Sequence, residues 1–254
     1  MNEKESRLTF RHKASEVCYQ KQVRDRYSDE DEPPLPHKSV KKARVRPVSR
    51  DAAKQIILKY EWLGTLPSGT NRFYGIFFGP FCAGVTCFCI GGGGANSNAH
   101  KEWNIERDEL AYLARGACVH WAPKNTNSKL ISWSVRLVAE DGRSKLAIAY
   151  SDTDAGEIGT VYQASNWTYV GKGSETRQWV APNGRVYDQR HPSNLRAKDG
   201  NKYPRIAYVK KLRDEGWTQQ KSNPKYKYVK VLRDDPKLER LVRLKSKPYP
   251  KRDD

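Results

Sequence analysis

The chain has 254 residues, of which 47 are Lys or Arg and 29 are Asp or Glu, so its formal net charge at pH 7 is +18. The length suits one large domain or two small ones. No apolar stretch of about 18 residues is present to cross a membrane. Seven Trp and fourteen Tyr exclude a fully disordered chain. A charge this positive favours a polyanionic partner, nucleic acid before an anionic membrane surface.

Residues 1–48 are predicted to form a flexible, charged N-terminal extension. An acidic run at 28–32 is followed by prolines and by a basic run at 41–46. Few large apolar residues occur here, so a packed core is not expected. The basic run suits either an arm that binds DNA or a solvated linker. The N-terminus shows no apolar segment of the secretory type, and we expect a cytoplasmic protein.

The first half of the folded domain, expected over residues 49–190, begins with a helix. Ser49 can cap it, and apolar residues then recur at helical spacing up to Tyr60. Residues 72–90 are typical of a β-hairpin that turns at Gly79-Pro80. The chain has an odd number of cysteines and no CxxC pair, and three of them lie in this apolar hairpin. We therefore expect the five to be reduced rather than disulfide-bonded or metal-bound: Cys18, Cys82, Cys87, Cys89 and Cys118.

The next elements alternate between strand and helix. A strand is predicted at 109–121, followed by a helix that Asn127 or Ser128 caps and that extends to about residue 139. The continuous apolar run at 145–151 suits a buried central strand.

A short helix around 158–162 follows, and closing strands are predicted at 167–171 and 176–190, the second turning at Asn183-Gly184. This alternation predicts an α/β (α+β) fold, with helices packed on a mixed sheet.

Residues 191–254 are predicted to form a basic, aromatic-rich C-terminal extension. A short helix is expected within residues 203–220, and Lys225, Lys227 and Lys230 then alternate with Tyr and Val. Phosphate contacts combined with stacking are what such a pattern can offer a nucleic acid. The alternative is a peripheral helix with a solvated tail.

The start of the helix after the 109–121 strand is a predicted anion site. Backbone N–H groups at a helix N-terminus have no partner within the helix and attract anions. The polar residues Lys124, Asn125, Asn127 and Ser128 surround this point. They suit a phosphate group of a cofactor or substrate, although an ordinary capped helix would have a similar sequence.

Two stretches resemble the Mom family of phage DNA-modification proteins. They are LARGACVHWAPKNTNSKLISWSVRL (residues 113–137) and LAIAYSDTDAGEIGTVYQASNWTYVGKG (residues 146–173). The most specific part is GTVYQASNWTYVG. The resemblance covers roughly residues 50–190 and implies a GNAT-like (N-acetyltransferase) fold with a mostly antiparallel central sheet. It also implies a transferase that converts adenine in DNA to N6-carbamoylmethyladenine, which hides phage DNA from host restriction enzymes.

The resemblance also implies site residues. It places the family's catalytically important Asp, Tyr and Arg at Asp152, Tyr162 and Arg115, and a donor-binding Ser at Ser128. Many relatives carry a His before the Leu-Gly that follows the first helix, and often a second His where Glu157 stands. In this chain Trp62 precedes that Leu-Gly. No metal ligand is therefore assigned, and a metal ion such as iron is left open.

The implied chemistry agrees with the residues at these positions. An adenine amine inside a duplex is reached only after the base leaves the stack, and Asp152, directly after the predicted central strand, can hold that amine and accept its proton. The Tyr162 phenol can donate to a leaving group or an oxyanion. Aromatic, amide and hydroxyl side chains expected to bind the substrate are Trp62, Tyr150, Ser151, Asn166 and Tyr169, with Ser128.

The donor has two candidates. The PKNTNSK segment contains none of the glycines with which ordinary GNAT enzymes approach the coenzyme A pyrophosphate. A glycyl-tRNA donor suits this departure and the glycine-like transferred group, and it would add tRNA to double-stranded DNA as a partner. Acetyl-coenzyme A rests on fold analogy. Two other functions stay open: acetylation of a protein or small amine with acetyl-coenzyme A, and non-catalytic DNA binding.

Overall fold

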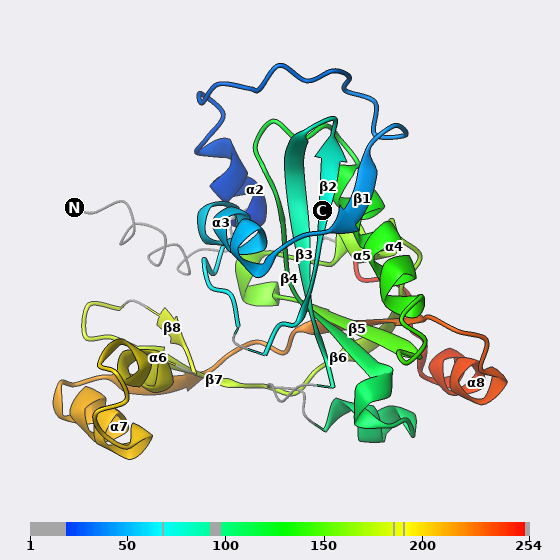
Figure 1. The fold of residues 1–254 in the computed structure, drawn as a ribbon. Coiled ribbons are helices and arrows are strands. Elements are labelled where there is room, and N and C mark those ends of the chain that lie inside the picture. The colour runs from blue at the N-terminus through cyan, green and yellow to red at the C-terminus, as the bar shows by residue number, and fades with distance from the viewer. Residues whose placement is uncertain (1–18, 68, 92–97, 185, 190, 252–254) are drawn as a thin grey trace.

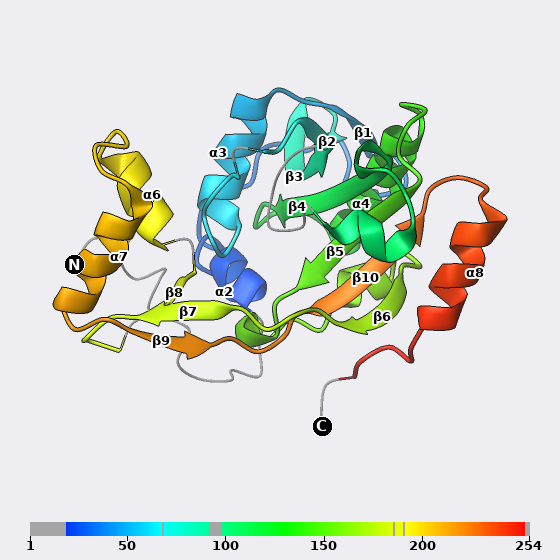
Figure 2. The same cartoon turned by 90° about the horizontal axis from the view of Figure 1, so that it is seen from below.

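A seven-stranded sheet forms the centre of the computed structural model, which describes residues 19–67, 69–91, 98–184, 186–189 and 191–251. The strand order is β1-β2-β3-β4-β5-β10-β6 (Figure 1, with β10 labelled in Figure 2). The strands are β1 (Arg44–Pro47), β2 (Arg72–Phe78), β3 (Phe81–Ile90), β4 (Leu110–Cys118), β5 (Leu146–Ser151), β6 (Thr168–Lys172) and β10 (Tyr226–Val231). Neighbouring strands are antiparallel except β4 and β5, which are parallel. The predicted mixed, mostly antiparallel sheet is confirmed.

Helices cover both faces of this sheet. They are α2 (Tyr19–Asp25), α3 (Arg50–Tyr60), α4 (Thr126–Ala139), α5 (Thr160–Gln163) and α8 (Pro236–Lys245). Strand β3 separates two layers, because its successive side chains point to opposite faces. Val85 and Cys87 pack in the cluster that contains Ile57 of α3, whereas Thr86 hydrogen bonds to Ser134 of α4.

The sequence located most elements of this sheet correctly. Ser49 caps α3 by accepting a hydrogen bond from the backbone N–H of Ala52 (3.2 Å). Helix α4 begins earlier than predicted: its N-cap is Asn125, in a left-handed conformation, and not Asn127 or Ser128. The shift occurs because Pro123 starts a turn whose carbonyl accepts from Thr126, and Asn tolerates left-handed backbone better than most residues.

Strands β4 and β5 pair only at their beginnings. Their parallel register covers Leu110 to Tyr112 against Leu146 to Ile148. Strand β4 continues to Cys118 and β5 to Ser151 without further pairing between them. The sheet therefore opens between the carboxyl ends of two adjacent strands, which is where α/β folds place their ligands.

The segment from residue 19 is packed, contrary to the flexible extension expected for residues 1–48. Strand β1 pairs with β2, and Tyr27, Leu35 and Val40 pack against the core that α3 covers. Lys129 Nζ of α4 donates to the carbonyls of Val40 and Lys41 (2.6 and 2.8 Å). Single, widely spaced apolar residues therefore anchor residues 19–48 to the core. Because they do not recur at helix or strand spacing, the sequence pattern did not predict this packing.

The segment after residue 190 contributes to both sheets rather than forming only an extension. Strand β10 lies between β5 and β6 in the centre of the main sheet. A second, three-stranded sheet contains β7 (Arg177–Val180), β8 (Val186–Asp188) and β9 (Thr218–Lys221), and helices α6 (His191–Lys198) and α7 (Arg205–Asp214) pack beside it. We call residues 174–224 the inserted lobe, and Figure 2 shows it extending away from the main sheet.

Four of the five cysteines lie within the described residues. Cys87 and Cys118 are buried free thiols and Cys82 is a half-buried one, whereas Cys18 lies outside the described residues. Burial raises the pKa of Cys87 and of Cys118 to about 12. Within the described ranges, every helix is too short or too polar to cross a bilayer.

Gly159, which precedes α5, is expected to be the least replaceable glycine near the opening. Its φ is +75°, and a Cβ added there would lie 2.3 Å from the ring of Tyr228. Gly200 also has a positive φ (+65°), but its added Cβ would meet nothing within 4 Å. Both Ala variants carry backbone strain of about 1–2 kcal/mol, and the clash should cost Gly159→Ala about 1–3 kcal/mol more. Denaturant unfolding of the two variants measures this difference, and equal losses would contradict the packing described for Tyr228.

Candidate active site

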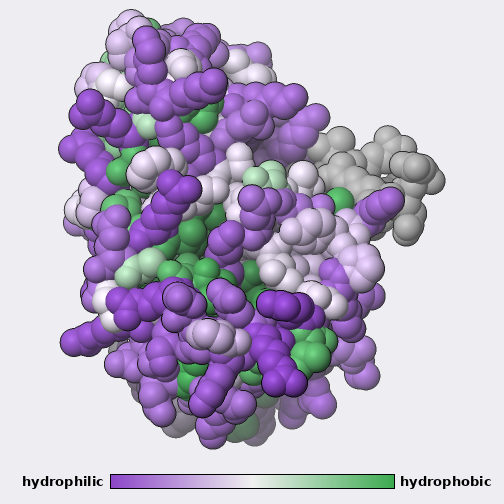
Figure 3. Space-filling view, turned by 90° about the vertical axis from the view of Figure 1, so that its right-hand side faces the viewer, coloured by the Kyte–Doolittle hydropathy of each residue, from purple (hydrophilic) through white to green (hydrophobic). Residues whose placement is uncertain are grey.

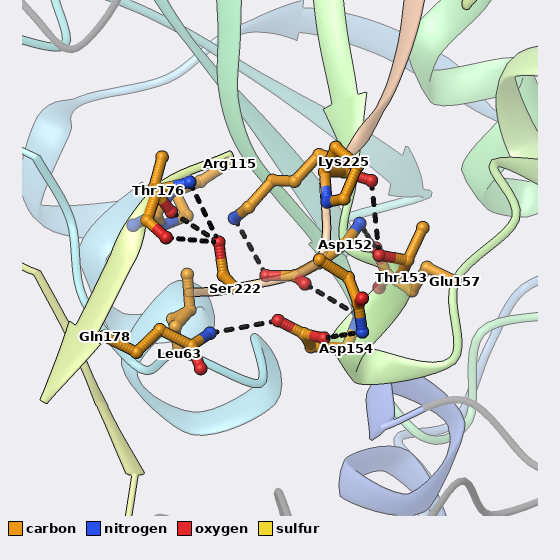
Figure 4. Close-up of polar contacts among 12 residues, drawn as sticks. Leu63, Arg115, Asp152, Thr153, Asp154, Glu157, Thr176, Gln178, Ser222 and Lys225 are labelled. Atoms are coloured by element: carbon orange, nitrogen blue, oxygen red, sulfur yellow. Dashed lines mark hydrogen bonds and ion pairs between the residues drawn. The ribbon is translucent and has the colours of Figure 1, made fainter. Parts of the chain in front are cut away.

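Asp152 stands at the opening, one residue after the end of β5. Its side chain is 6% exposed and caps a short turn by accepting from the N–H of Asp154 (Oδ1, 3.1 Å). The second oxygen, Oδ2, lies 2.8 Å from Lys225 Nζ. Figure 4 shows this carboxylate between Lys225 and the turn that carries Glu157. A buried carboxylate held by a cation and an N–H keeps a fixed orientation.

Lys225 comes from the segment just before β10. Its neighbours fasten that segment to the turn at Asp152: Asn223 Nδ2 donates to Asp154 Oδ1 (2.7 Å), and Thr153 Oγ1 donates to the carbonyl of Pro224 (3.4 Å). Gln178 of β7 donates to Asp154 Oδ2 (3.0 Å) (Figure 4). The base of the inserted lobe is therefore hydrogen bonded to the turn that carries the predicted catalytic Asp.

Arg115 enters the site from a bulge in β4. Its side chain is 8% exposed, and its Nε lies 3.8 Å from Glu61 Oε2 and donates to the carbonyl of Thr65 (2.9 Å). Glu61 follows α3 and also accepts from the N–H groups of Leu63 and Gly64 (2.9 and 3.0 Å). Burial raises the pKa of Glu61 to about 7, although Arg115 opposes this shift.

Glu157 lies between Asp152 and Tyr162. Its Oε2 accepts from the backbone N–H of Asp152 (3.3 Å), and burial raises the pKa of its carboxyl to about 7. Burial, and after it the nearby charge of Glu157, raise the pKa of the Tyr162 phenol well above its usual range. This tyrosine packs against Trp167 and Tyr228, with ring centroids 5.4 and 5.2 Å away. Its phenol therefore stays protonated, as a hydrogen-bond donor.

The predicted catalytic residues are thus linked through neighbours that sequence reasoning did not assign. Arg115 lies beside Glu61, Glu157 accepts from the Asp152 N–H, and the charge of Glu157 contributes to the raised pKa of Tyr162. Together with Lys225 the group holds three carboxyl side chains and two cations. Of these neighbours, the sequence pattern indicated only Glu157, which stands where the resemblance implies a His. The signal that could have found the others was weak, because surface Glu and Lys residues look the same in a sequence.

The residues predicted to bind substrate lie in different environments. The half-buried Tyr150 packs edge-on to Tyr112 (6.1 Å), and Ser151 is 1% exposed with a hydroxyl that has no hydrogen-bond partner among the described residues. Trp62 is half-buried in the loop after Glu61. The other two lie further along the chain. Tyr169 is buried among core aromatics, and Asn166 is exposed with its carbonyl accepting from Lys230.

The predicted anion site forms the first turn of α4. Lys124 and Asn125 are exposed, and the Ser128 hydroxyl donates to the carbonyl of Asn125 (3.0 Å). The buried Oδ1 of Asn127 has no partner within the described part of the chain. Ser165, three residues after Tyr162, donates to the Ser128 carbonyl (3.2 Å) and so ties this turn to the end of α5. The turn and the site are therefore joined through α5.

The charged groups at the opening do not fit a metal ion. Lys225 is already within 2.8 Å of Asp152, and the Arg115 guanidinium faces Glu61. Across residues 19–251, apart from the few undescribed positions, no three His, Cys, Asp or Glu side chains are grouped so that they could bind one.

The face that carries α4, α5 and α8 is mostly hydrophilic. In Figure 3 apolar residues gather in a recessed band across the middle of that face. Large apolar side chains exposed on these elements include Trp133 of α4 and Leu244 of α8. A polar surface around an apolar recess is typical of a ligand-binding region.

The sequence of the chain matches a known protein family. A family model described as the Mom protein family matches residues 42–251. No curated protein sequence matches the chain significantly.

Solved structures that are similar to the chain include acetyltransferases. One from Bacillus subtilis, in complex with CoA, has 10% sequence identity and a TM-score of 0.41, and the match covers 75% of this chain and 99% of that one. An IAA acetyltransferase from Bacillus cereus has 11% identity and a TM-score of 0.41 (74% and 99% covered). FeeM, an N-acyl amino acid synthase from uncultured soil microbes, has 15% identity and a TM-score of 0.41 (75% and 91% covered).

Proposed function

The chain belongs to the Mom protein family, and from this premise we propose that it is a phage transferase that converts adenine in DNA to N6-carbamoylmethyladenine. The modification would protect phage DNA from host restriction. The observation that supports the proposal is that Arg115 of β4 and Asp152, just after β5, lie on the two strands that part, each buried beside a partner of opposite charge. With Tyr162, these are the residues at which the resemblance implies the family's catalytic side chains.

The proposed reaction requires first that the adenine N6 amine be held in position. The lone pair of the adenine N6 amine is delocalised into the ring, so the amine is a poor nucleophile and gains from being held in place. Asp152 accepts a hydrogen bond from it, while Lys225 and the Asp154 N–H hold the carboxylate still. The protonated Tyr162 phenol donates to the oxygen or leaving group on which charge develops.

A duplex substrate requires the adenine to be flipped out of the stack. The chain's excess of 18 positive charges supports binding to the DNA backbone. Around the opening, Trp62 and Tyr150 are half-buried aromatics that could stack on the flipped base, and Ser151 offers a hydroxyl without a partner among the described residues. These three, with Asn166, are the base-binding residues that we propose.

The donor is proposed to bind at the first turn of α4. Lys124, Asn125 and Asn127 would meet its phosphates, and Ser128 would lie beside its reactive end. Both acetyl-coenzyme A and glycyl-tRNA carry phosphates, so the turn suits either. Incubation of purified protein and DNA with each donor in turn distinguishes the two.

Nucleoside mass spectrometry tests the proposal. DNA from cells that express the chain is expected to contain a new deoxyadenosine, heavier by one carbamoylmethyl group, because the site positions an amine beside a carboxylate and a phenol. DNA from cells that express the Tyr162→Phe variant is the control, since this change removes only the phenol hydroxyl. A strong loss of the new nucleoside is expected with it.

Two other results would redirect the assignment. Unmodified adenine together with acetylation of a protein or small amine would indicate an ordinary acetyltransferase. Unmodified adenine together with DNA binding that weakens steeply with salt, and that Asp152→Asn leaves intact, would indicate a non-catalytic DNA-binding protein.

A further inference from the structure

The Asp152 carboxylate has a positive partner on each oxygen. Oδ2 is 2.8 Å from the Lys225 ammonium, and Oδ1 accepts from the N–H of Asp154 (3.1 Å). These contacts leave lone pairs that can accept a hydrogen bond from an amine. Taking up a proton, however, would cost the ion pair with Lys225. The geometry suits Asp152 to orienting a substrate better than to removing its proton.

Glu157 is differently placed in the same site. One oxygen, Oε2, accepts from the backbone N–H of Asp152 (3.3 Å), which fixes the side chain beside that carboxylate. The other oxygen, Oε1, has no hydrogen-bond partner among the described residues, and no cation lies within ion-pair distance of the side chain among them. The residue belongs to the short loop that runs from Asp152 to α5, and its charge contributes to the raised pKa of Tyr162.

We propose that Glu157, rather than Asp152, takes the proton that leaves the nucleophilic amine, while Asp152 orients that amine. The assignment rests on the proposed function. It adds to the site a proton acceptor that the sequence pattern did not assign.

The step balances as an acyl transfer. With a glycyl ester it gives N6-glycyladenine, an isomer of N6-carbamoylmethyladenine from which the proposed product follows by internal rearrangement, whereas an acetyl thioester gives N6-acetyladenine. The N6 lone pair forms a bond to the reactive carbon of a thioester or ester donor. The bond between that carbon and its sulfur or oxygen leaving group breaks, and its electron pair goes to the leaving group. The N6–H proton passes to Glu157 Oε1, and the electron pair of that N–H bond stays on nitrogen.

The electrostatics of the site support this division of roles. Burial raises the pKa of Glu157 to about 7, close to the pH at which the protein would act, and Asp152 and Glu61 add to the shift while Lys225 opposes it. A general base is most effective when its pKa is near the working pH. Above that pKa the carboxylate is ready to accept a proton, and below it the site loses its acceptor.

The test compares Glu157→Gln with the wild-type protein. Gln keeps the volume and the oxygen that accepts from Asp152 N–H but cannot take the proton, so the rate of adenine modification should fall about 100-fold. The wild-type rate should rise with pH through about 7, and the variant should lack this rise. Glu32→Gln is the matched control: Glu32 makes an exposed ion pair with Lys38 (2.8 Å), and its loss should change neither rate nor profile.

A rescue experiment separates proton transfer from a structural role. Glu157→Ala should regain part of the lost rate when acetate is added, because a free carboxylate can occupy the vacated space and accept the proton. DNA affinity should be the same in all three variants. A Glu157→Gln rate within threefold of wild type, or a variant whose profile keeps the rise near pH 7, would overturn the proposal.

A second readout does not depend on adenine modification. In protein labelled with ¹³C at Glu side-chain carboxyls, the Glu157 signal should titrate near pH 7. Lys225→Met should move this titration to higher pH, whereas Lys221→Met should leave it unchanged. If Glu157 titrates below pH 5.5, the proposal fails even when DNA modification is confirmed. If Glu157 titrates near pH 7 but the protein leaves adenine unmodified, the result would support Glu157 as a proton acceptor and reject adenine in DNA as the substrate.

Discussion

Asp152→Asn is expected to abolish adenine modification while DNA binding stays unchanged. The substitution keeps the size of the side chain and removes the negative charge that faces the amine and Lys225. An amide in its place presents either its N–H₂ group or a neutral oxygen, and both hold a neutral amine less firmly than a carboxylate does. Because positioning and proton transfer both depend on this arrangement, the rate should fall by at least about 1,000-fold.

The fold should survive this change. Asp152 caps a helical turn by accepting from the N–H of Asp154, and Asn caps such turns about as well as Asp. Asp235 offers a matched control, since it caps α8 by accepting from Leu238 N–H (3.0 Å) on another part of the molecule. Asp235→Asn should keep both stability and activity. Quantitative mass spectrometry of nucleosides and a DNA-binding titration measure the two properties, and retained modification in Asp152→Asn would remove Asp152 from the mechanism.

Local patterns were sufficient to predict most of the sheet. Helix α3 has a capping Ser and apolar residues at helical spacing, and the β2–β3 hairpin has a Gly-Pro turn between two apolar runs. Strand β5 is a continuous apolar run, typical of a strand covered on both faces. In each case the residues that determine the element are close together in the sequence.

The arrangement of the C-terminal third could not be predicted in this way. The alternation of Tyr, Lys and Val in β10 was visible, but its partners β5 and β6 lie up to 85 residues earlier, as in the pairing of Val231 with Leu146. Pairing across that distance depends on which sheet edge the rest of the fold leaves open. The lobe also obscures the pairing of β6 with β10 in the sequence. Without it, the two strands would be close in the sequence and their pattern would predict a hairpin.

The candidate site was predicted only in part for a related reason. Asp152 and Tyr162 stand in a stretch with a distinctive local sequence, whereas Glu61 and Lys225 gain their roles from tertiary structure. Burial beside Arg115 makes Glu61 unusual, and the position of β10 brings Lys225 to Asp152. Neither effect leaves a trace in the neighbouring residues.

A chain that ends at residue 190, the boundary expected from the sequence, should not fold. It would lack β10, whose Tyr228 and Val229 are fully buried between β5 and β6. Losing buried side chains of this size costs about 3–5 kcal/mol each. Two strands would also lose their hydrogen-bonded neighbour. The sum is comparable with the whole stability of a typical domain, about 5–15 kcal/mol.

Excision of the inserted lobe should have the opposite outcome. Gly173 N–H donates to the carbonyl of Lys225 (2.8 Å), so the ends of β6 and β10 already meet as a hairpin would. Replacing residues 174–224 with Asn-Gly, a sequence that favours the tight turn of a two-residue hairpin, should give a chain that unfolds cooperatively. The lobe carries eleven Lys or Arg against five Asp or Glu, and its loss should weaken DNA binding about 10- to 100-fold at low salt and flatten its salt dependence.

Circular dichroism melts and DNA titrations at several salt concentrations measure both results. The two deletions separate the lobe from the segment that carries β10 and α8, because both chains lack residues 191–224 and only one keeps residues 225–254. A cooperative melt of the chain that ends at 190 would contradict the central place of β10. Unchanged DNA affinity after lobe excision would assign the nucleic-acid surface to the rest of the chain, which carries most of its Lys and Arg residues.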